Sequence, residues 1–341
     1  MAELRLQINE DGAGSVNEMT YKDVYDMWIQ QHKLEVKPTT YRAINSKFKR
    51  ILPKFGHLKI TAITGLYCQK VINEWAKELK TFHDYKIQAN LVFKYAMRYD
   101  LIQKNPMEHV TMPKLQNQVY FNEDEEKVNF FNQDQLEEFL SKARGGMHFK
   151  DFALFQLLAF TGMRKGEALA LHCSDIDFEH GYITIQKTLD MEKGKNYLQT
   201  VKTIDARRVI DVGQKTLSVL KEWQDIQMEE YSKAGLHYEE RKEPVFTRFN
   251  PQKVSMNYMR LASPNDTLTR FFANHEEFTK ITVHGFRHTH ASLLFELGAT
   301  VKAVQARLGH SDIQTTMNIY THLSKSEKEK TAKLFDDHID F

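Results

Sequence analysis

Residues 161–167 read TGMRKGE, and residues 284–288 read HGFRH. The first stretch places Arg164 at a turn just before an expected helix, where its forked guanidinium and the helix N-terminus both favour a phosphate. In the second stretch His284 and Arg287 lie three residues apart at the expected start of another helix, so both side chains face one side. The two stretches therefore predict an anion-binding site in the second half of the chain.

Two further stretches add groups that can transfer protons or attack phosphorus. Residues 200–203, TVKT, place Lys202 beside an expected strand, and residues 308–312, LGHSD, place His310 ten residues before Tyr320. Two arginines can bind the oxygens of one phosphodiester. A tyrosine hydroxyl is a poor nucleophile at neutral pH and needs such a positive site around it. Cationic side chains can stabilise the developing negative charge, so we expect no metal ion. We expect no use of ATP either, because residues 213–216, GQKT, lack the earlier glycine of a phosphate-binding loop, where Arg208 stands.

The order Arg, Lys, His-x-x-Arg, His, Tyr resembles that of the tyrosine recombinases, which include phage integrases, conjugative-transposon integrases and chromosome-dimer resolvases. The resemblance runs from Asn132 to the C-terminus, about 200 residues. It implies the following roles: Arg164 and Arg287 clamp the scissile phosphate, His310 binds it, Lys202 is the general acid for the 5′-oxygen, His284 is the general base or proton shuttle, Tyr320 forms the 3′-phosphotyrosyl bond, and Glu167 orients the site from behind.

The resemblance implies a site-specific DNA recombinase that integrates or excises a mobile element without a cofactor. The implied partners are double-stranded DNA core sites, three further copies of the chain in a homo-tetramer, and accessory DNA-bending or excision factors. Three alternatives stay open: a chromosome or plasmid dimer resolvase, a relaxing enzyme like the type IB topoisomerases, and a DNA-binding regulator without enzymatic activity.

The apolar periodicity predicts a mainly α fold with a small antiparallel β-sheet, that is, an α+β protein. In residues 20–112 we expect a bundle of about four helices, the first capped by Thr20 and the second ended by Pro53 and Gly56. Asn132 is expected to cap a helix, and further helices are expected over 149–159 and 164–171. Residues 182–185 alternate as a strand does, a second strand is expected to end at 208–210, and from Thr216 onward we expect helices.

Charge divides the chain more sharply than composition does. The formal net charge of the 341 residues is only +2, but residues 20–112 hold 16 lysines and arginines against 8 aspartates and glutamates, a net charge of +8. The rest of the chain therefore carries −6. A basic segment of domain size suits a phosphate backbone, although a solvated, lysine-rich helical surface would have the same composition.

We accordingly expect four segments. Residues 1–19 form an N-terminal arm or the remnant of an arm-binding domain, for which they are too short. Residues 20–112 form the helical core-binding domain that the resemblance implies, and the polar residues 113–128 form a linker. Residues 129–341 form the catalytic domain, whose C-terminal tail, apolar at Leu334 and Phe335, docks on a neighbouring protomer or packs on its own domain.

Several other functions are disfavoured by the sequence. No apolar run is long enough to cross a bilayer, no signal peptide is evident, and two distant cysteines, Cys68 and Cys173, fit a reduced cytoplasmic setting in which the protein associates with the nucleoid when bound to DNA. His284, His288 and His290 have a spacing that zinc ligands use, but no Glu-x-x-His pattern accompanies them. Ala206 stands where the family often has serine, a departure of little expected consequence.

Overall fold

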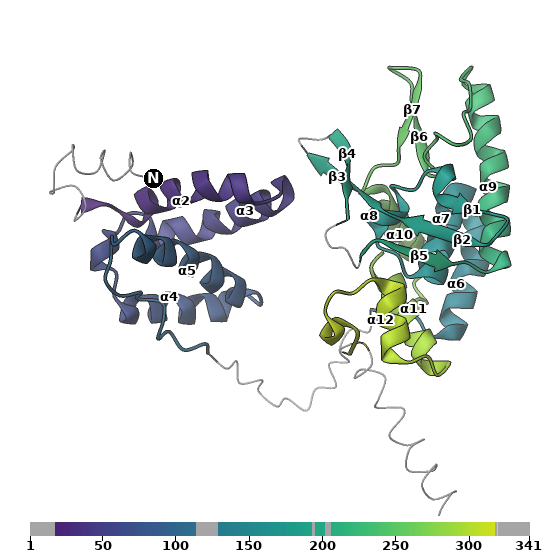
Figure 1. Ribbon diagram of the computed structural model, residues 1–341. Helices are drawn as coiled ribbons and strands as arrows, with labels where there is room; N and C mark the ends of the chain where they lie inside the picture. The colour runs from purple at the N-terminus through teal and green to yellow at the C-terminus, as the bar shows by residue number, and fades with distance from the viewer. Residues whose placement is uncertain (1–17, 114–128, 193–194, 202–205, 318, 320–341) are drawn as a thin grey trace, which may run out of the picture. The chain divides into compact units, whose positions relative to one another are not determined.

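The chain divides into two compact units, Met1–Asn122 and Glu123–Phe341. The structure, a computed structural model, describes residues 18–113, 129–192, 195–201, 206–317 and 319 (Figure 1). Most of the predicted arm (residues 1–19), nearly all of the predicted linker (113–128), Gly194 and the predicted C-terminal tail lie outside the described residues. Among the described helices, none combines the length and apolar character that crossing a bilayer requires.

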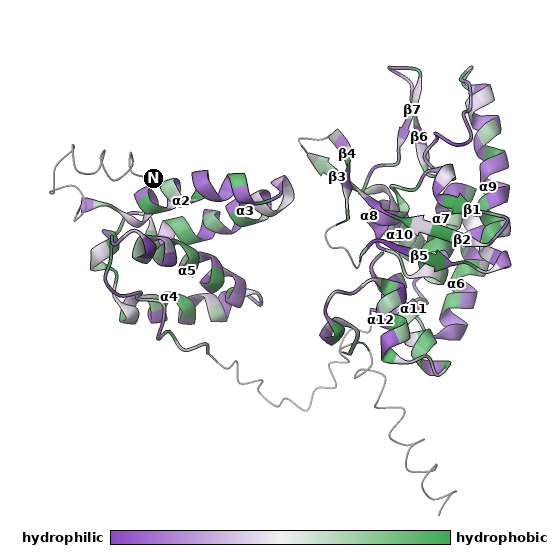
Figure 2. Ribbon diagram, in the orientation of Figure 1, coloured by the Kyte–Doolittle hydropathy of each residue, from purple (hydrophilic) through white to green (hydrophobic). Residues whose placement is uncertain are grey.

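The first unit is built from helices α2 (Tyr21–Glu35), α3 (Pro38–Phe55), α4 (Gly65–Glu78) and α5 (Phe82–Arg98), with a short 3₁₀ turn at Ile60–Ala62. Apolar and polar residues interleave along each helix (Figure 2), as expected of helices that bury one face. Tyr21, Phe55 and Phe93 meet in the centre, with ring centroids 5.1 to 6.0 Å apart. The predicted helical bundle is confirmed.

Local sequence determines where the helices of this unit begin. Thr20 forms a capping box with Asp23: the Thr20 hydroxyl accepts from the Asp23 amide, and the Asp23 carboxylate accepts from the Thr20 amide. The expected end at Pro53 is wrong, because α3 continues through Pro53 to Phe55. A proline so close to a helix end removes one backbone donor, and burial of Ile51 and Phe55 keeps the last turn in place.

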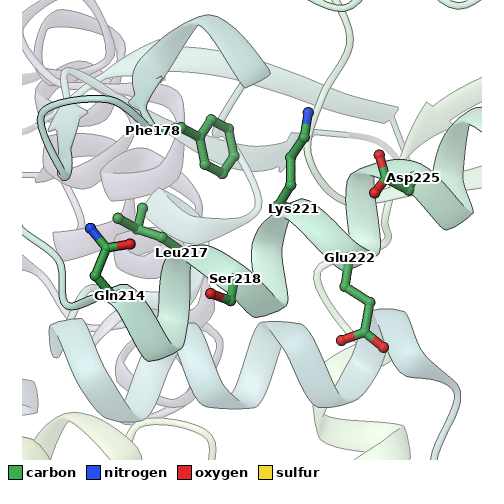
Figure 3. Close-up of a pocket in the computed structure, with 7 residues that line it drawn as sticks. All are labelled: Phe178, Gln214, Leu217, Ser218, Lys221, Glu222 and Asp225. Atoms are coloured by element: carbon green, nitrogen blue, oxygen red, sulfur yellow. The ribbon is translucent and has the colours of Figure 1, made fainter.

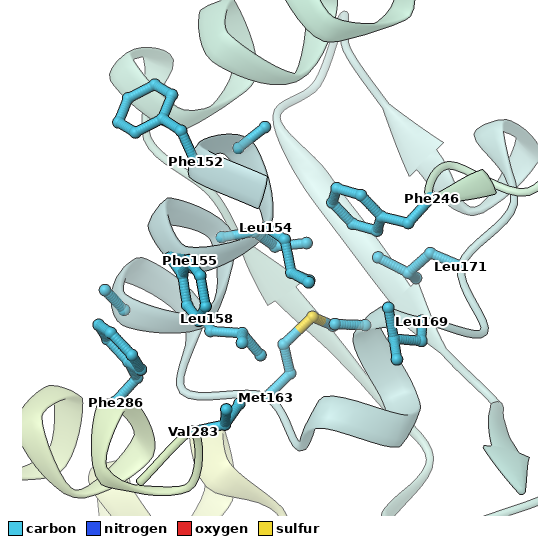
Figure 4. Close-up of a cluster of buried hydrophobic side chains, with 14 of the residues drawn as sticks. Phe152, Leu154, Phe155, Leu158, Met163, Leu169, Leu171, Phe246, Val283 and Phe286 are labelled. Atoms are coloured by element: carbon cyan, nitrogen blue, oxygen red, sulfur yellow. The ribbon is translucent and has the colours of Figure 1, made fainter. Parts of the chain in front are cut away.

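The second unit surrounds one buried helix, α7 (Phe149–Thr161), which is covered by α6 (Gln133–Gly146), α9 (Gln214–Lys233) and α11 (Gly285–Glu296). Nine of the residues of α7 are buried, so it packs on all sides. Figure 4 shows Phe155 of α7 facing Phe286 of α11, and Met163 in the same apolar cluster. The centroids of the two phenylalanine rings are 5.2 Å apart. The helices α10 (Ser263–Asn274) and α12 (Val301–Leu308) complete the helical part.

In the part of the chain that the structure describes, the β-structure comprises three small antiparallel pieces. One sheet has the order β1-β2-β5 (Ile176–Asp177, Tyr182–Ile185, Arg208–Asp211), and β3 and β4 (Lys187–Glu192, Lys195–Thr200) form a hairpin. The predicted strand over 182–185 is confirmed. The region expected to contain one strand ending at 208–210 contains two, β4 and β5, and Arg208 begins β5 instead of lying near a strand end.

Two further expectations about the second unit need correction. The helix expected over 164–171 is the single turn α8 (Lys165–Ala168), after which the Leu171 carbonyl accepts from the Val245 amide. The region after Thr216 is not wholly helical, because β6 (Thr247–Asn250) and β7 (Ser255–Tyr258) form a hairpin between α9 and α10. Both strands have only four residues with few buried side chains, so they lack the apolar alternation on which a strand prediction depends. The Asn132 cap is confirmed, with Gln135 completing its capping box.

Gly162 occupies a position in the second unit that requires glycine. It ends α7 with φ +64°, and a Cβ built there would lie 2.6 Å from Leu308 Cδ2 and 2.7 Å from His290 Cδ2. An alanine would therefore have both an unfavourable backbone and no space.

We predict that Gly162→Ala lowers the free energy of unfolding of the C-terminal unit by about 2 kcal/mol or more, measured by urea denaturation. Gly145→Ala is the matched control, because Gly145 lies within α6 and a Cβ added there would meet nothing within 4 Å. The control should be neutral or slightly stabilising. Equal stability of the two variants would show that Gly162 is not needed for this packing.

Candidate active site

Arg164 and Glu167 are fixed by the geometry of the single-turn helix α8. Arg164 is the N-cap residue, and the carboxylate of Glu167 accepts from both the Arg164 amide and the Arg164 guanidinium, each at 2.9 Å. Glu167 is 2% exposed, whereas the Arg164 side chain is 40% exposed. The guanidinium is therefore held from behind while part of it stays open to solvent and to a ligand.

Arg208 is the second cation on Glu167. Its guanidinium donates to the Glu167 carboxylate at 2.9 Å, to the Arg307 carbonyl at 2.9 Å and to the Ala206 carbonyl at 3.2 Å. Burial opposes ionisation of Glu167, but Arg208 first and then Arg164 outweigh it, and the pKa of the carboxyl is lowered. Glu167 is thus a buried anion shared by two arginines.

Arg287, on α11, is buried in a different way. It is 2% exposed, and its two terminal nitrogens donate to the Gly162 carbonyl at 2.7 Å and the Leu308 carbonyl at 2.8 Å. Among the described residues no carboxylate pairs with it, and its Nε has no hydrogen-bond partner there. Burial and the nearby Arg164 lower the pKa of Arg287 to about 9, which leaves it charged at neutral pH.

The carbonyls that hold these arginines lie at the C-terminal ends of two helices. α7 ends at Gly162 and α12 ends at Gly309, both with left-handed backbone conformation. Gly309 also offers its carbonyl to Arg164 at 3.4 Å. The C-terminus of a helix carries a partial negative charge. It therefore stabilises a guanidinium without neutralising its full charge, as a carboxylate would.

His284 and His310 lie in the same cluster. His284 is the N-cap residue of α11, and its pKa is lowered to about 4 by burial and then by His288, Arg287 and Arg164. The pKa of His310 is lowered to about 3 by burial and then by Arg287, Arg164, His284 and Arg208. Both histidines therefore lie near Arg164 and Arg287, and both imidazoles are neutral at pH 7.

Two predicted residues, Lys202 and Tyr320, lie outside the described residues. The nearest described residues are Val201 and Ala206, which flank the segment that contains Lys202 and are buried, and Ile319, which packs with Phe295, Leu308 and other residues of α11 and α12. The structure brings together Arg164, Glu167, His284, Arg287 and His310, and the positions of Lys202 and Tyr320 in this arrangement stay predictions.

Sequence reasoning did not single out Arg208 as a site residue. The pair Arg207-Arg208 was visible, but its two members have different environments: Arg207 is exposed, whereas the Arg208 side chain is 6% exposed. The alternation of side chains between the two faces of a strand could have indicated that Arg208 is buried. Arg208 lies two residues before the buried Ile210, so both side chains project from the same face of β5.

His290 does not join a histidine cluster of the kind zinc uses. Its Nδ1 lies 2.8 Å from the Ala159 carbonyl, and its Nε2 accepts from Arg307 Nε at 2.9 Å, so both ring nitrogens are engaged. Within the described part of the chain, no group of three or more His, Cys, Asp or Glu side chains is arranged to hold a metal ion.

A hollow beside α9 is a separate feature. Figure 3 shows Phe178, Leu217 and Lys221 among the side chains that line it. None of the predicted site residues lines this hollow, and Lys221 lies over the Phe178 ring at 5.7 Å from its centroid. The arginine cluster, and not this hollow, carries the charges suited to a phosphate.

Comparison with known families identifies the chain. Residues 129–327 match the phage integrase family, and residues 20–76 match the N-terminal SAM-like domain of phage integrases. The chain belongs to the phage integrase family of tyrosine recombinases. Members of this family are enzymes that break and rejoin DNA strands, so the predicted family, fold class and enzyme class are confirmed.

Relatives and solved structures agree with this assignment. The chain is 24% identical to the ICEBs1 integrase of Bacillus subtilis, with 98% of this chain and 88% of the relative covered. It is 28% identical to the integrase of Staphylococcus phage L54a, with 97% of each covered. Its fold is similar to that of the Tn1549 transposon integrase in complex with a circular intermediate DNA, with a TM-score of 0.72, 22% identity and coverage of 92% of this chain and 99% of that one.

We predict that Glu167→Gln destabilises this phage integrase family member strongly, by about 3 to 5 kcal/mol, because it leaves two arginines beside a buried neutral amide. Glu222→Gln is the control, since Glu222 pairs with Arg144 where both side chains are about half exposed, and it should change stability by less than about 1 kcal/mol. Urea denaturation of both variants measures the difference. Similar small losses would mean that Glu167 does not hold the cluster.

A second prediction concerns pH. Burial lowers the pKa of His290 to about 4, from an ordinary 6.5. Between these two pH values His290 is protonated in the unfolded chain and neutral in the folded chain. The contribution of His290 to stability is complete above about pH 6.5 and declines as pH falls toward 4. His290→Gln, which keeps one donor and one acceptor, should lose less stability between pH 7 and pH 5 than the parent chain does, as judged from urea midpoints. An equal loss in both proteins would contradict the account.

Proposed function

We propose that the cluster around Glu167 binds the scissile phosphate of a DNA core site, with Arg164, Arg287 and His310 in contact with its non-bridging oxygens. The observation that carries the proposal is the charge imbalance. The three arginines Arg164, Arg208 and Arg287 are accompanied by one carboxylate, Glu167, which pairs with the first two. With both histidines neutral, this cluster of described residues has a net charge of +2. A phosphodiester supplies the missing negative charge, and guanidinium groups match its geometry.

The chemistry proposed for this site is an in-line displacement at phosphorus. The Tyr320 hydroxyl oxygen forms a bond to phosphorus, and the bond from phosphorus to the 5′-oxygen breaks. His284, neutral in the unliganded site, accepts the tyrosine proton. Lys202 donates a proton to the departing 5′-oxygen. The 3′-phosphotyrosyl linkage conserves the bond energy, so attack by a 5′-hydroxyl of another strand reverses the same steps and rejoins DNA.

The division of labour between the units belongs to the same proposal. The basic unit, residues 20–112, holds core-site DNA as a core-binding domain, and the catalytic unit begins at residue 129. Four protomers assemble on paired sites, with the C-terminal tails docking between them and accessory factors bending the DNA or favouring excision. A cytoplasmic, nucleoid-associated location is part of this picture. The net charge of +8 on the first of these segments supports its role on DNA.

The three alternative functions differ from this proposal in the target DNA, in the number of protomers that act together, or in whether DNA is cleaved. A dimer resolvase would use the same cluster on chromosomal or plasmid sites, so the target DNA distinguishes it. A relaxing enzyme of the type IB kind would act as a monomer on unpaired duplex. A DNA-binding regulator would need neither Tyr320 nor the buried charge of Arg287. A buried guanidinium that has no carboxylate partner among the described residues is costly to maintain for binding alone.

We predict that the protein forms a covalent product with a nicked duplex that contains its core site, identified from the direct repeats flanking the element. The reaction is run in EDTA, and a DNA-linked protein band on a denaturing gel measures it. The wild type should give the band and Tyr320→Phe should give none, because the nucleophile is removed. Absence of the band from both proteins would overturn the enzymatic proposal.

Arg287→Ala serves as the second arm of that experiment. It should abolish the band while leaving much of the DNA affinity, since the basic segment 20–112 is proposed to bind most of the DNA backbone. Arg144→Ala is the matched control because Arg144 forms an exposed ion pair with Glu222, and it should cleave as the wild type does. Parallel loss of cleavage and binding in Arg287→Ala would count against a catalytic role for this residue.

A further inference from the structure

The main chain of His310 is held rigidly by the end of α12. The His310 amide donates to the Gln305 carbonyl at 3.2 Å, and the Gln305 side-chain amide donates to the His310 carbonyl at 3.0 Å. Gly309, immediately before it, adopts a left-handed conformation with φ +68°. These bonds fix the point from which the imidazole projects, but they do not fix how the ring is rotated or where its proton lies.

Thr316 supplies that second constraint. Its side chain is fully buried, and its Oγ1 lies 2.8 Å from Nδ1 of His310. A threonine hydroxyl inside a helix commonly bonds to the carbonyl four residues earlier. Here it meets an imidazole that also lies among Arg164, Arg208 and Arg287. The other ring nitrogen, Nε2, makes no hydrogen bond to the residues that the structure describes.

We propose that Thr316 is a positioning residue whose hydroxyl donates to Nδ1 of His310 and thereby keeps the proton on Nε2, from which the ring donates to a non-bridging oxygen of the scissile phosphate. The inference rests on the function proposed above, in which this cluster binds that phosphate. It adds a residue that acts on the phosphate through His310.

Whether the Thr316 hydroxyl donates or accepts is decided by the phosphate oxygen that Nε2 of His310 is proposed to bind. A hydroxyl can donate or accept, and a neutral imidazole has one N–H and one lone pair. If Nδ1 carried the proton, the lone pair on Nε2 would face the lone pairs of a phosphate oxygen and repel it. Burial and the nearby arginines keep the ring neutral, with a pKa of about 3 in the unliganded site, so the position of its single proton decides whether His310 attracts the phosphate.

Thr316→Val tests the proposal because it removes the donor and conserves the shape. At saturating DNA, the single-turnover rate of covalent product formation should fall about tenfold or more, since one donor to the transition state is misplaced. Thr316→Ser, which restores the hydroxyl, should recover most of the rate. Thr315→Val is the matched control, because Thr315 is the exposed neighbour in the same helix, and it should cleave normally.

A double-mutant cycle separates positioning from a purely structural role. If Thr316 acts through His310, Thr316→Val should have no further effect on the cleavage rate in a His310→Ala background. Wild-type cleavage by Thr316→Val, or an equal fold-loss in both backgrounds, would overturn the proposal. Failure of the wild type to form the Tyr320-linked product would instead overturn the function on which the proposal rests.

The tautomer itself can be observed without any cleavage. Long-range ¹H–¹⁵N spectra of the full chain labelled at histidine, with the His310 signals assigned by their loss in His310→Ala, report which ring nitrogen carries the proton. We expect the Nε2–H form in the wild type and in Thr316→Ser, and a shift away from it in Thr316→Val. The Nδ1–H form in the wild type would overturn the proposal even if the variants failed to fold.

Discussion

The structure of the catalytic unit depends on how it accommodates the charge of Arg287. This guanidinium is buried, and its hydrogen bonds go to carbonyls at the ends of α7 and α12, with no carboxylate partner among the described residues. Carbonyl dipoles stabilise a cation while leaving its net charge in place. A carboxylate in their position would have made a more stable ion pair and a poorer phosphate site. The two helix ends therefore both support the fold and preserve the positive charge that the chemistry needs.

The remaining parts of the cluster follow from that constraint. Gly162 has to be a glycine because its carbonyl must point to Arg287 while its Cα lies against Leu308 and His290. Glu167 offsets two other arginines, so the accumulated charge stays tolerable in the buried site. Because burial and then the nearby positive charges keep both imidazoles neutral, the positions of their protons become important. The family assignment and this electrostatic arrangement lead to the same conclusion, a site built for a phosphodiester.

Much of this architecture was predictable because it depends on local sequence patterns. The caps at Thr20 and Asn132 and the strand over 182–185 depend on residues adjacent in sequence, and all three are confirmed. The β6–β7 hairpin was missed because its short strands are mostly polar, and Pro53 was misjudged because burial of the last turn outweighs one lost donor. The residues adjacent to a helix or strand therefore predict where it begins. Where it ends depends on tertiary packing, which local sequence does not show.

In the candidate site, too, local motifs were predictable and contacts between distant segments were not. Motif order identified Arg164, Glu167, His284, Arg287 and His310, which the fold brings together, whereas the roles of Lys202 and Tyr320 stay predictions. Arg208 and Thr316 escaped notice because their importance depends on contacts with Glu167 and His310 across the fold, and no spacing rule encodes those contacts. The bonds from Arg287 to the two helix-end carbonyls are equally invisible in sequence, since they require α7, α11 and α12 to be packed first.

The central claim, that uncompensated charge on Arg287 is directed at the scissile phosphate, is tested most directly by measuring equilibrium affinity in a Tyr320→Phe background. The parent and its Arg287→Ala variant are each titrated with a core-site duplex and with the same duplex carrying a neutral methylphosphonate at the cleavage position. The account predicts that neutralising this one phosphate weakens binding by the parent several-fold, about 1 kcal/mol, and weakens binding by the Arg287→Ala variant much less, because only Arg164 and His310 then remain to contact it. An equal loss of affinity in both proteins would contradict it.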